Sequence, residues 1–182
     1  MRKYIIPIVM ALLLSSCAAI GNKYILSEDT NSIANATIEE MIGFIKNRDA
    51  IALRAMFSLN TQRSSPYFGD DLTELIEFIE GDVISVSDAK DSGLSTDRLI
   101  DYEKVIVTIQ PCFTIITEKS KYYLAFFQCL KDDYDSDNIG ITTLFVINAD
   151  DWDRDYVYRG DGSFENPGIY VGRKALERLN DY

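Results

Sequence analysis

The fold class is decided by residues 102–130, which read YEKVIVTIQPCFTIITEKSKYYLAFFQCL. Residues 102–116 are rich in β-branched side chains, which favour an extended strand. Pro111 lacks a backbone N–H, so we expect it at a sheet edge or a bulge. Lys119-Ser120-Lys121 predicts a turn into a second strand, residues 122–130. The stretch therefore predicts a long antiparallel hairpin.

Helical patterns precede this hairpin, and shorter strands flank it. Thr37 and Asp49 are candidate N-caps of the first two helices, and Asp70 or Asp71 of the third. The first and third helices carry apolar residues at helical spacing, namely Ile38, Met41, Ile42 and Ile45, then Leu72, Leu75, Ile76 and Ile79. Residues 83–86 and 139–148 read as strands, with a polar loop at 88–97. This order predicts an α+β fold: three N-terminal helices packed on a curved antiparallel sheet of about four to five strands, shaped as a cone.

The N-terminus has the three parts of a secretory signal. Met1-Arg2-Lys3 is basic, residues 4–14 are apolar, and Leu14-Ser15-Ser16 are followed by Cys17. The Leu-Ser-Ser-Cys ending resembles the lipobox of bacterial lipoproteins. That resemblance implies cleavage before Cys17, acylation of its thiol (diacylglyceryl, palmitate-type chains) and anchoring at the extracytoplasmic face of the cell membrane. The expected organisation is a signal peptide at 1–16, a lipidated N-terminus and tether at 17–35, and one domain at 36–182.

The rest of the chain resembles a known group of proteins through three short motifs. Asp49 opens a segment that ends Met56-Phe57-Ser58, Phe78-Ile79-Glu80-Gly81 precedes the first strand, and Asn138-Ile139-Gly140-Ile141 opens a late strand. Over about residues 36–150 this order is similar to an uncharacterised family of Gram-positive lipoproteins. The resemblance implies a cystatin-like cone, related to nuclear-transport-factor-2-like domains, and no established activity.

The net charge of the chain limits the classes of molecule that are expected to bind it directly. Removing residues 1–16 takes away two of 18 basic residues and none of 29 acidic ones, which leaves a formal charge of −13. Such a charge repels nucleic acid and anionic headgroups, so neither is an expected direct partner. The expected partners are the lipid bilayer, through acylated Cys17, and a small ligand or a protein.

The sequence contains no histidine. Ser-His-Asp and Cys-His catalysis and His-ligated zinc are therefore excluded, and proton transfer at neutral pH needs a strongly shifted carboxylate, lysine or tyrosine. Tyr102 beside Asp101 or Glu103 is not such a site, because adjacent strand residues point to opposite faces. We identify no catalytic residue and expect no cofactor.

Cys112 and Cys129 remain after Cys17 is assigned to the lipid. A hairpin that turns at 119–122 places Glu118 opposite Tyr123 and Cys112 opposite Cys129. The pair is then either a disulfide, common in exported proteins, or two half-buried thiols. Two thiolates alone do not hold zinc.

Calcium is the one metal that the sequence suggests. Asp133, Asp135 and Asp137 have the alternate spacing of an EF-hand loop, but Asn138 and Leu144 stand where that loop needs Gly and Glu. A solvated hairpin tip is the competing interpretation, so we assign no metal. A second acidic cluster, within residues 150–155, has the same two interpretations, a calcium site or a solvated acidic loop.

Three functions remain open. Aromatic residues in the strands could line the cone and contact a flat ligand, although such residues more often form a core. The sequence favours a ligand-binding or interaction module held at the membrane. The alternatives are a pocket enzyme using carboxylate and tyrosine acid-base chemistry, and a structural lipoprotein whose exposed sheet face contacts a partner.

Overall fold

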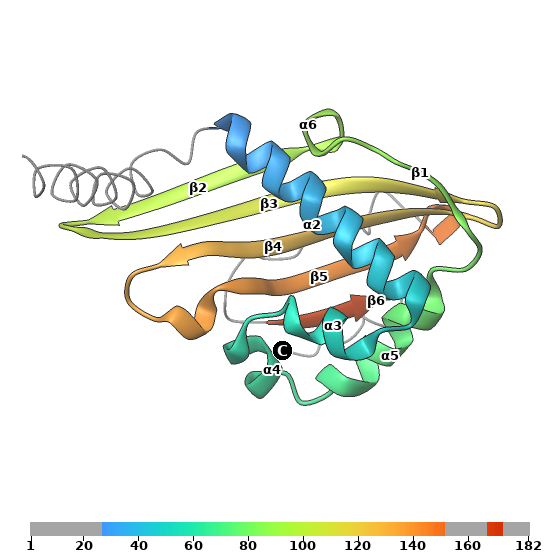
Figure 1. The fold of residues 1–182 in the computed structure, drawn as a ribbon, viewed down its shortest axis with the longest axis horizontal. Coiled ribbons are helices and arrows are strands. Elements are labelled where there is room, and N and C mark those ends of the chain that lie inside the picture. The colour runs from blue at the N-terminus through green and yellow to red at the C-terminus, as the bar shows by residue number, and fades with distance from the viewer. Residues whose placement is uncertain (1–26, 152–166, 173–182) are drawn as a thin grey trace, which may run out of the picture.

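The computed structural model describes residues 27–151 and 167–172, and it confirms the α+β class. The N-terminal helices pack on a curved, unclosed, mixed sheet of six strands (Figure 1). The helices are α2 (Ser27–Asn47), α3 (Ala50–Ala55), α4 (Leu59–Ser64), α5 (Phe68–Phe78) and α6 (Ala89–Ser92), with short 3-10 turns η1 (Ser136–Asn138) and η2 (Ala149–Asp151). The strands are β1 (Val83–Val86), β2 (Leu94–Asp101), β3 (Lys104–Thr117), β4 (Lys121–Asp132), β5 (Gly140–Asn148) and β6 (Gly168–Val171).

The sheet follows the order β1-β3-β4-β5-β6, and β2 also pairs with β3. β1 and β2 therefore share one side of β3, with β1 beside its C-terminal end and β2 beside its N-terminal part. β6 runs parallel to β5, so the expected purely antiparallel sheet is wrong, as is the strand count. Register shifts in the ladders of β3 and β4 bend the sheet, as bulges do.

Pro111 lies in the middle of β3, between β2 and β4, and not at the expected edge. Its partner Leu94 is the first residue of β2, and Cys112 N–H donates to the carbonyl of Gly93 at 2.7 Å. The ladder between β2 and β3 thus begins at the residue that cannot donate a hydrogen bond. The irregularity of the β3–β4 ladder falls opposite Val107/Thr108, with the extra residue in β4.

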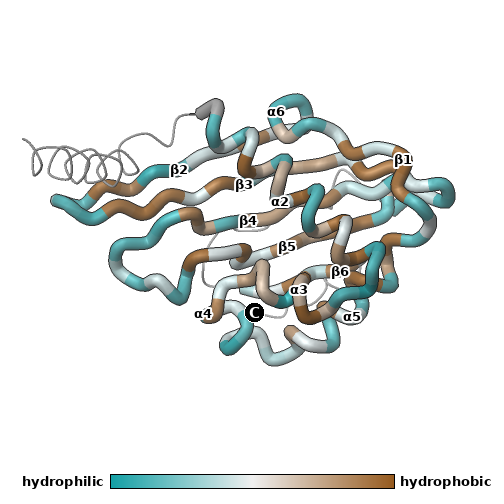
Figure 2. The backbone as a smooth tube through the Cα atoms, viewed as in Figure 1, coloured by the Kyte–Doolittle hydropathy of each residue, from teal (hydrophilic) through white to brown (hydrophobic). Residues whose placement is uncertain are grey.

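The space between α2 and the sheet is filled by side chains. Met41 of α2, Phe113 of β3 and Phe126 of β4 are each at most 1 % exposed. The predicted stripes of the first and third helices belong to this core, with Ile42 partly buried. Figure 2 shows hydrophobic residues along the strands that α2 crosses.

α2 begins ten residues earlier than the predicted N-cap Thr37. Thr30 and Ala34 are buried, at 1 % and 0 %, and lie on the same face as Ile38. Residues 27–35, expected in the tether, therefore form the first turns of a helix that packs on the sheet. Their side chains are too small and polar to give an apolar stripe in the sequence.

The hairpin register also differs from the predicted one. Ile116 pairs with Lys121, and the hydroxyl of Thr117 accepts hydrogen bonds from the N–H groups of Lys119 and Ser120. This local Thr turn closes the hairpin earlier than expected. Cys112 consequently pairs with Ala125, and Cys129 with Thr108.

The two cysteines are free thiols in this arrangement. Four residues of strand separate Cys112 from Thr108, the partner of Cys129, which is about 13 Å at the rise of a β-strand. A disulfide needs Cα atoms within about 7 Å, so the predicted neighbouring positions are wrong.

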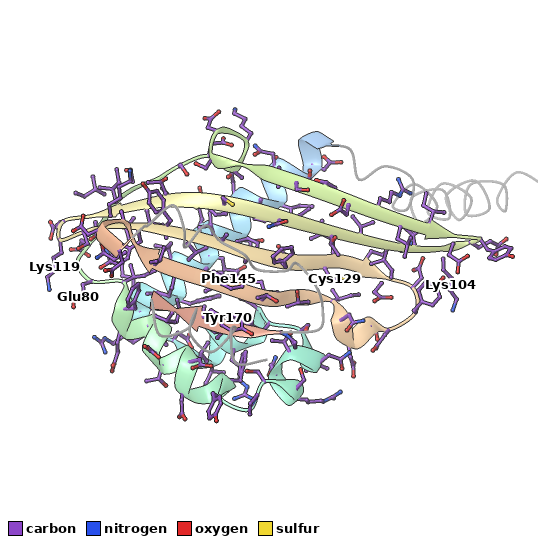
Figure 3. The ribbon with its side chains drawn as sticks, turned by 180° about the vertical axis from the view of Figure 1, so that it is seen from behind. Glu80, Lys104, Lys119, Cys129, Phe145 and Tyr170 are labelled. Carbon is purple, nitrogen blue, oxygen red and sulfur yellow. The ribbon has the colours of Figure 1, made fainter. Side chains whose placement is uncertain are left out.

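Sequence patterns missed the helices α4 and α6 and the strands β2 and β6. α4 and α6 are single short helices, and β2 occupies part of the predicted polar loop. β2 is exposed at every residue after Leu94, so it lacks the alternation of a half-buried strand. On the sheet face away from the helices, Phe145 of β5 stacks on Tyr170 of β6, with ring centroids 4.8 Å apart (Figure 3).

The predicted signal and Cys17 fall outside the described residues. The sequence also predicts an aromatic segment at 152–158, a turn at 160–162 and a short last helix from Arg173, and these too lie outside the described residues. Within the described residues, no helix combines the length and the apolar character needed to cross a membrane.

Candidate functional site

The candidate site is built around α4, which the sequence positions against β5. Ser58 caps this helix: its hydroxyl oxygen accepts the N–H of Thr61 at 3.1 Å and donates to the Thr61 hydroxyl oxygen at 2.9 Å. The Thr61 hydroxyl then donates to the carbonyl of Thr142 on β5 at 3.0 Å. All three residues are buried, and these bonds satisfy groups that would otherwise be costly to bury.

Gly140 allows β5 to lie close to the segment that joins α3 to α4. Ile141 N–H donates to the Met56 carbonyl, and Ser58 N–H donates to the Ile141 carbonyl, both at 2.9 Å. A Cβ on Gly140 would stand 2.8 Å from the Ser58 nitrogen, and its φ is +122°. Only glycine suits both requirements. The segments that end in Ser58 and Ile141 are therefore direct hydrogen-bonding neighbours in the fold.

An open pocket of about 470 Å³, lined mostly by residues with polar side chains, lies between α4, η1 and β5. We call it the α4 pocket. It is lined by Ser58, Asn60, Thr61, Arg63, Ser64, Asn138, Thr142 and Pro167. The four hydroxyl groups already donate to protein acceptors, so they offer a ligand their oxygen lone pairs, and the guanidinium of Arg63 supplies further N–H donors. The volume lies in the range of small-molecule sites.

A chain of hydrogen bonds holds the wall of this pocket. Asn60 Nδ2 donates to Asn138 Oδ1 at 2.7 Å and to Asp135 Oδ2 at 2.8 Å. Asn138 Nδ2 donates to Asp132 Oδ2 at 2.8 Å. Both amides are thereby oriented before any ligand arrives, which reduces the cost of ordering them on binding.

Asp132 anchors the network from the end of β4. It is 8 % exposed, and its Oδ1 accepts the N–H groups of Tyr134 and Asp135 at 2.8 and 3.0 Å. Desolvation by burial raises its pKa, but the hydrogen bonds from Asn138, Asp135 and Tyr134 outweigh it, so the pKa of Asp132 lies below its ordinary value. The group remains a carboxylate at neutral pH and acts as an acceptor, not as a general base.

The three calcium candidates have separate partners. Asp133 Oδ2 lies 3.0 Å from Lys131 Nζ, and Asp137 Oδ2 lies 2.6 Å from Arg63 Nη1. Asp135 accepts from Asn60 and from the N–H of Asp137. Among residues 27–151 and 167–172, no group of three or more acidic or cysteine side chains is arranged to hold a metal ion.

A second polar region lies at the opposite end of the sheet. Buried Tyr122 lines a pocket of about 390 Å³ together with Glu74, Glu77 and Glu80. Its hydroxyl oxygen accepts the N–H of Glu80 at 3.1 Å. These glutamates are exposed, and Glu80 pairs with Lys119 at 3.0 Å (Figure 3). A tyrosine and carboxylates do meet, but without the burial that turns a carboxylate into a base.

Neither Cys112 nor Cys129 has a reactive thiol. Burial, followed by the nearby Asp132 charge, raises the pKa of Cys129 to about 11, and burial also raises the pKa of Cys112. Both thiols stay protonated at neutral pH, so neither is an activated nucleophile.

Sequence reasoning identified the acidic loop of this site but missed its helix. Asn60, Thr61 and Arg63 lie in a stretch for which the sequence predicts no element, and no pattern linked them to Asn138, 75 or more residues away. The signal that was present is Ser58 followed by Thr61, the spacing of an N-cap.

Comparison with known proteins yields one family. Residues 40–149, more than half of the chain, match the model of a family described as Domain of unknown function (DUF5104). The matched range includes every lining residue of the α4 pocket except Pro167. No curated protein matches the chain. The chain belongs to the DUF5104 family.

Proposed function

We propose that this protein is a lipid-anchored, extracytoplasmic membrane lipoprotein that binds a small polar ligand in the α4 pocket. The observation that carries the ligand-binding part is the preoriented pair Asn60 and Asn138, which faces a pocket lined with hydroxyl groups. The anchoring part rests on the signal and Cys17. Neither part involves nucleic acid or a cofactor.

The chemistry of the pocket indicates the class of ligand. Amide and hydroxyl groups recognise a compound rich in hydroxyl or amide groups, and Arg63 adds one positive charge at the rim. The carboxylates of Asp135 and Asp137 lie next to that rim, which disfavours a strongly anionic ligand. A neutral sugar or a zwitterionic amino acid fits these groups best.

The alternative is an enzyme using Tyr122 with Glu74, Glu77 or Glu80. The meeting of these residues in one pocket is the observation that favours it. A structural role is the third candidate, and the filled core beneath α2 favours it over a ligand held inside the cone. Both are alternatives to the proposed binding of a ligand in the α4 pocket.

The anchor is tested by Cys17→Ser. Because this change removes the thiol that accepts the lipid, we expect uncleaved precursor without radiolabelled palmitate. Labelling at the wild-type level in this variant would contradict the anchoring part.

The pocket is tested by ligand screening of the purified full chain, using a panel of monosaccharides, disaccharides and amino acids. We expect at least one to raise the melting temperature in proportion to its concentration. Asn60→Ala should abolish the shift, and Asn47→Ala, an exposed change on α2, should preserve it. A shift that survives Asn60→Ala would exclude the α4 pocket as the site.

A further inference from the structure

The hairpin formed by β2 and β3 extends beyond the rest of the sheet. β4 pairs with β3 only as far as Ile106, whereas β2 continues to Asp101, opposite Lys104. Beyond their own hairpin, residues 99–106 contact the segment that follows β4: Ile106 pairs with Asp132, Val105 exchanges hydrogen bonds with Asp133, and the Tyr134 hydroxyl donates to Asp101. We call residues 99–106 the β2–β3 tip, and Figure 1 shows it projecting at one end of the molecule.

The tip exposes large apolar or aromatic side chains on both faces of the hairpin and at its turn, beside the exposed charged residues Asp101, Glu103 and Lys104. Leu99 and Ile100 are 60 % and 59 % exposed, and Tyr102 at the turn is 96 % exposed. Adjacent strand residues point to opposite faces, so Leu99 lies on one face of the hairpin and Ile100 on the other. Figure 2 shows hydrophobic residues on both strands just behind the end of the hairpin.

Tyr102 is an unusual residue for this turn. Its φ is +53°, a conformation that glycine and asparagine adopt far more readily than tyrosine. A side chain kept at a strained and fully exposed position indicates a role in function rather than in folding. Tyrosine joins an apolar ring to a polar hydroxyl, which suits the boundary between lipid chains and water.

The position of the lipid points to the membrane as the partner. Ser27 follows Cys17 by ten positions in the chain, a span of at most about 35 Å. The first turns of α2 lie against β2, where the Thr96 hydroxyl donates to the Thr30 hydroxyl oxygen at 3.4 Å. Tyr102 is six residues further along, about 20 Å. The start of α2 lies over β2 on the side of the molecule from which the tip projects, and the tip extends well beyond it (Figure 1).

The polar groups near the tip fit the headgroup layer. Asp101 accepts a hydrogen bond from the Tyr134 hydroxyl at 2.7 Å, and Lys104 Nζ lies 4.2 Å from the centroid of the Tyr134 ring. Figure 3 places Lys104 at the end of the molecule opposite Lys119. A flat protein surface would cover only one face of the hairpin, whereas a bilayer surrounds both.

We propose that the β2–β3 tip enters the headgroup region of the membrane that holds Cys17 and so fixes the orientation of the domain. This inference rests on the proposed lipid anchor. Leu99 and Ile100 then contact the upper acyl chains from the two faces of the hairpin, and Tyr102 leads the insertion.

The test uses the full lipidated chain in phosphatidylcholine vesicles. Cys112 and Cys129 are replaced by Ala, and a fluorophore sensitive to polarity is attached through Tyr102→Cys. The matched control carries the label through Ile84→Cys, because Ile84 is 67 % exposed in β1, at the far end of β3. Flotation measures the anchor, and quenching by nitroxide-labelled lipid measures contact with the bilayer.

We expect a blue shift and quenching of the label at 102, and neither at 84. Protein that floats with equal, weak quenching at both positions overturns the tip contact and leaves the anchor standing, and the tip then belongs to a protein contact. Lipidated protein that does not float overturns both the anchor and this inference.

Discussion

Gly140 is the residue on which the candidate site most depends. It lets β5 run within hydrogen-bonding distance of the chain between α3 and α4, and these bonds place α4 beside η1. A side chain at this position must displace backbone, because the nearest atoms are the Ser58 nitrogen and the Met56 oxygen.

Gly140→Ala is therefore expected to destabilise the domain by about 2 kcal/mol or more, through steric overlap and backbone strain. Urea unfolding measures this loss. Gly43→Ala is the matched control: Gly43 lies within α2, and a Cβ added there would meet nothing within 4 Å, so alanine should stabilise by about 0.5–1 kcal/mol. Equal effects of the two changes would contradict the close approach.

The cysteines give a second prediction at the residue scale. With the pKa of Cys129 raised to about 11 and Cys112 half-buried, both thiols should resist iodoacetamide in the native protein at pH 7.5 and react after unfolding without reductant. Mass spectrometry counts the added groups. A native mass two daltons lower, with no alkylation after unfolding, would reveal a disulfide and contradict the register of β3 and β4.

At the scale of elements, the loop between β4 and β5 is ordered by one buried carboxylate. Asp132 joins the end of β4 to the backbone of residues 134 and 135 and to Asn138. Asp132→Asn keeps the size of the side chain but turns an amide donor toward Asn138 Nδ2. We expect a loss of about 1–3 kcal/mol at pH 7, because two donors then face each other.

The same carboxylate predicts a pH dependence. A pKa lowered by folding stabilises the native state above the unfolded pKa, and this contribution is lost as the pH falls through the folded value. Wild-type stability should therefore fall below about pH 4, where unfolded aspartate titrates. Denaturant unfolding at several pH values should give a flatter profile for Asp132→Asn than for the exposed control Asp97→Asn. Parallel profiles would show that Asp132 titrates alike in both states.

At the scale of the whole molecule, α2 ties the N-terminal segment to the sheet. Thr30 and Ala34 are buried against it, and Thr37 donates to Gln128 Oε1 at 3.2 Å. A truncated chain of residues 36–182, which begins at the domain boundary expected from the sequence, loses the first turns of this helix.

We expect residues 36–182 to retain mixed helix and sheet but to unfold at lower urea than residues 27–182, because buried contacts of α2 are missing. Circular dichroism during urea titration compares the two. Identical midpoints would show that residues 27–35 contribute nothing to the fold.

Local sequence patterns were enough to predict the α+β class, the apolar faces of the first and third helices and the two long strands of the hairpin. These features depend on periodicity: Ile38, Met41 and Ile45 recur at helical spacing, and β-branched residues fill β3. The N-cap at Asp49 was also predictable, because it is a local interaction: its side chain accepts a hydrogen bond from the N–H of Ala52, three residues away.

The register, the strand order and the candidate site could be seen only in the folded chain. The Thr117 turn moved Cys112 away from Cys129, and β6 added a parallel partner to β5. Asn60 meets Asn138 only because β5 packs against the chain before α4. Such contacts join segments far apart in the chain, and no local pattern encodes them. The candidate site therefore depends on tertiary packing, whereas the class of fold depends on periodicity.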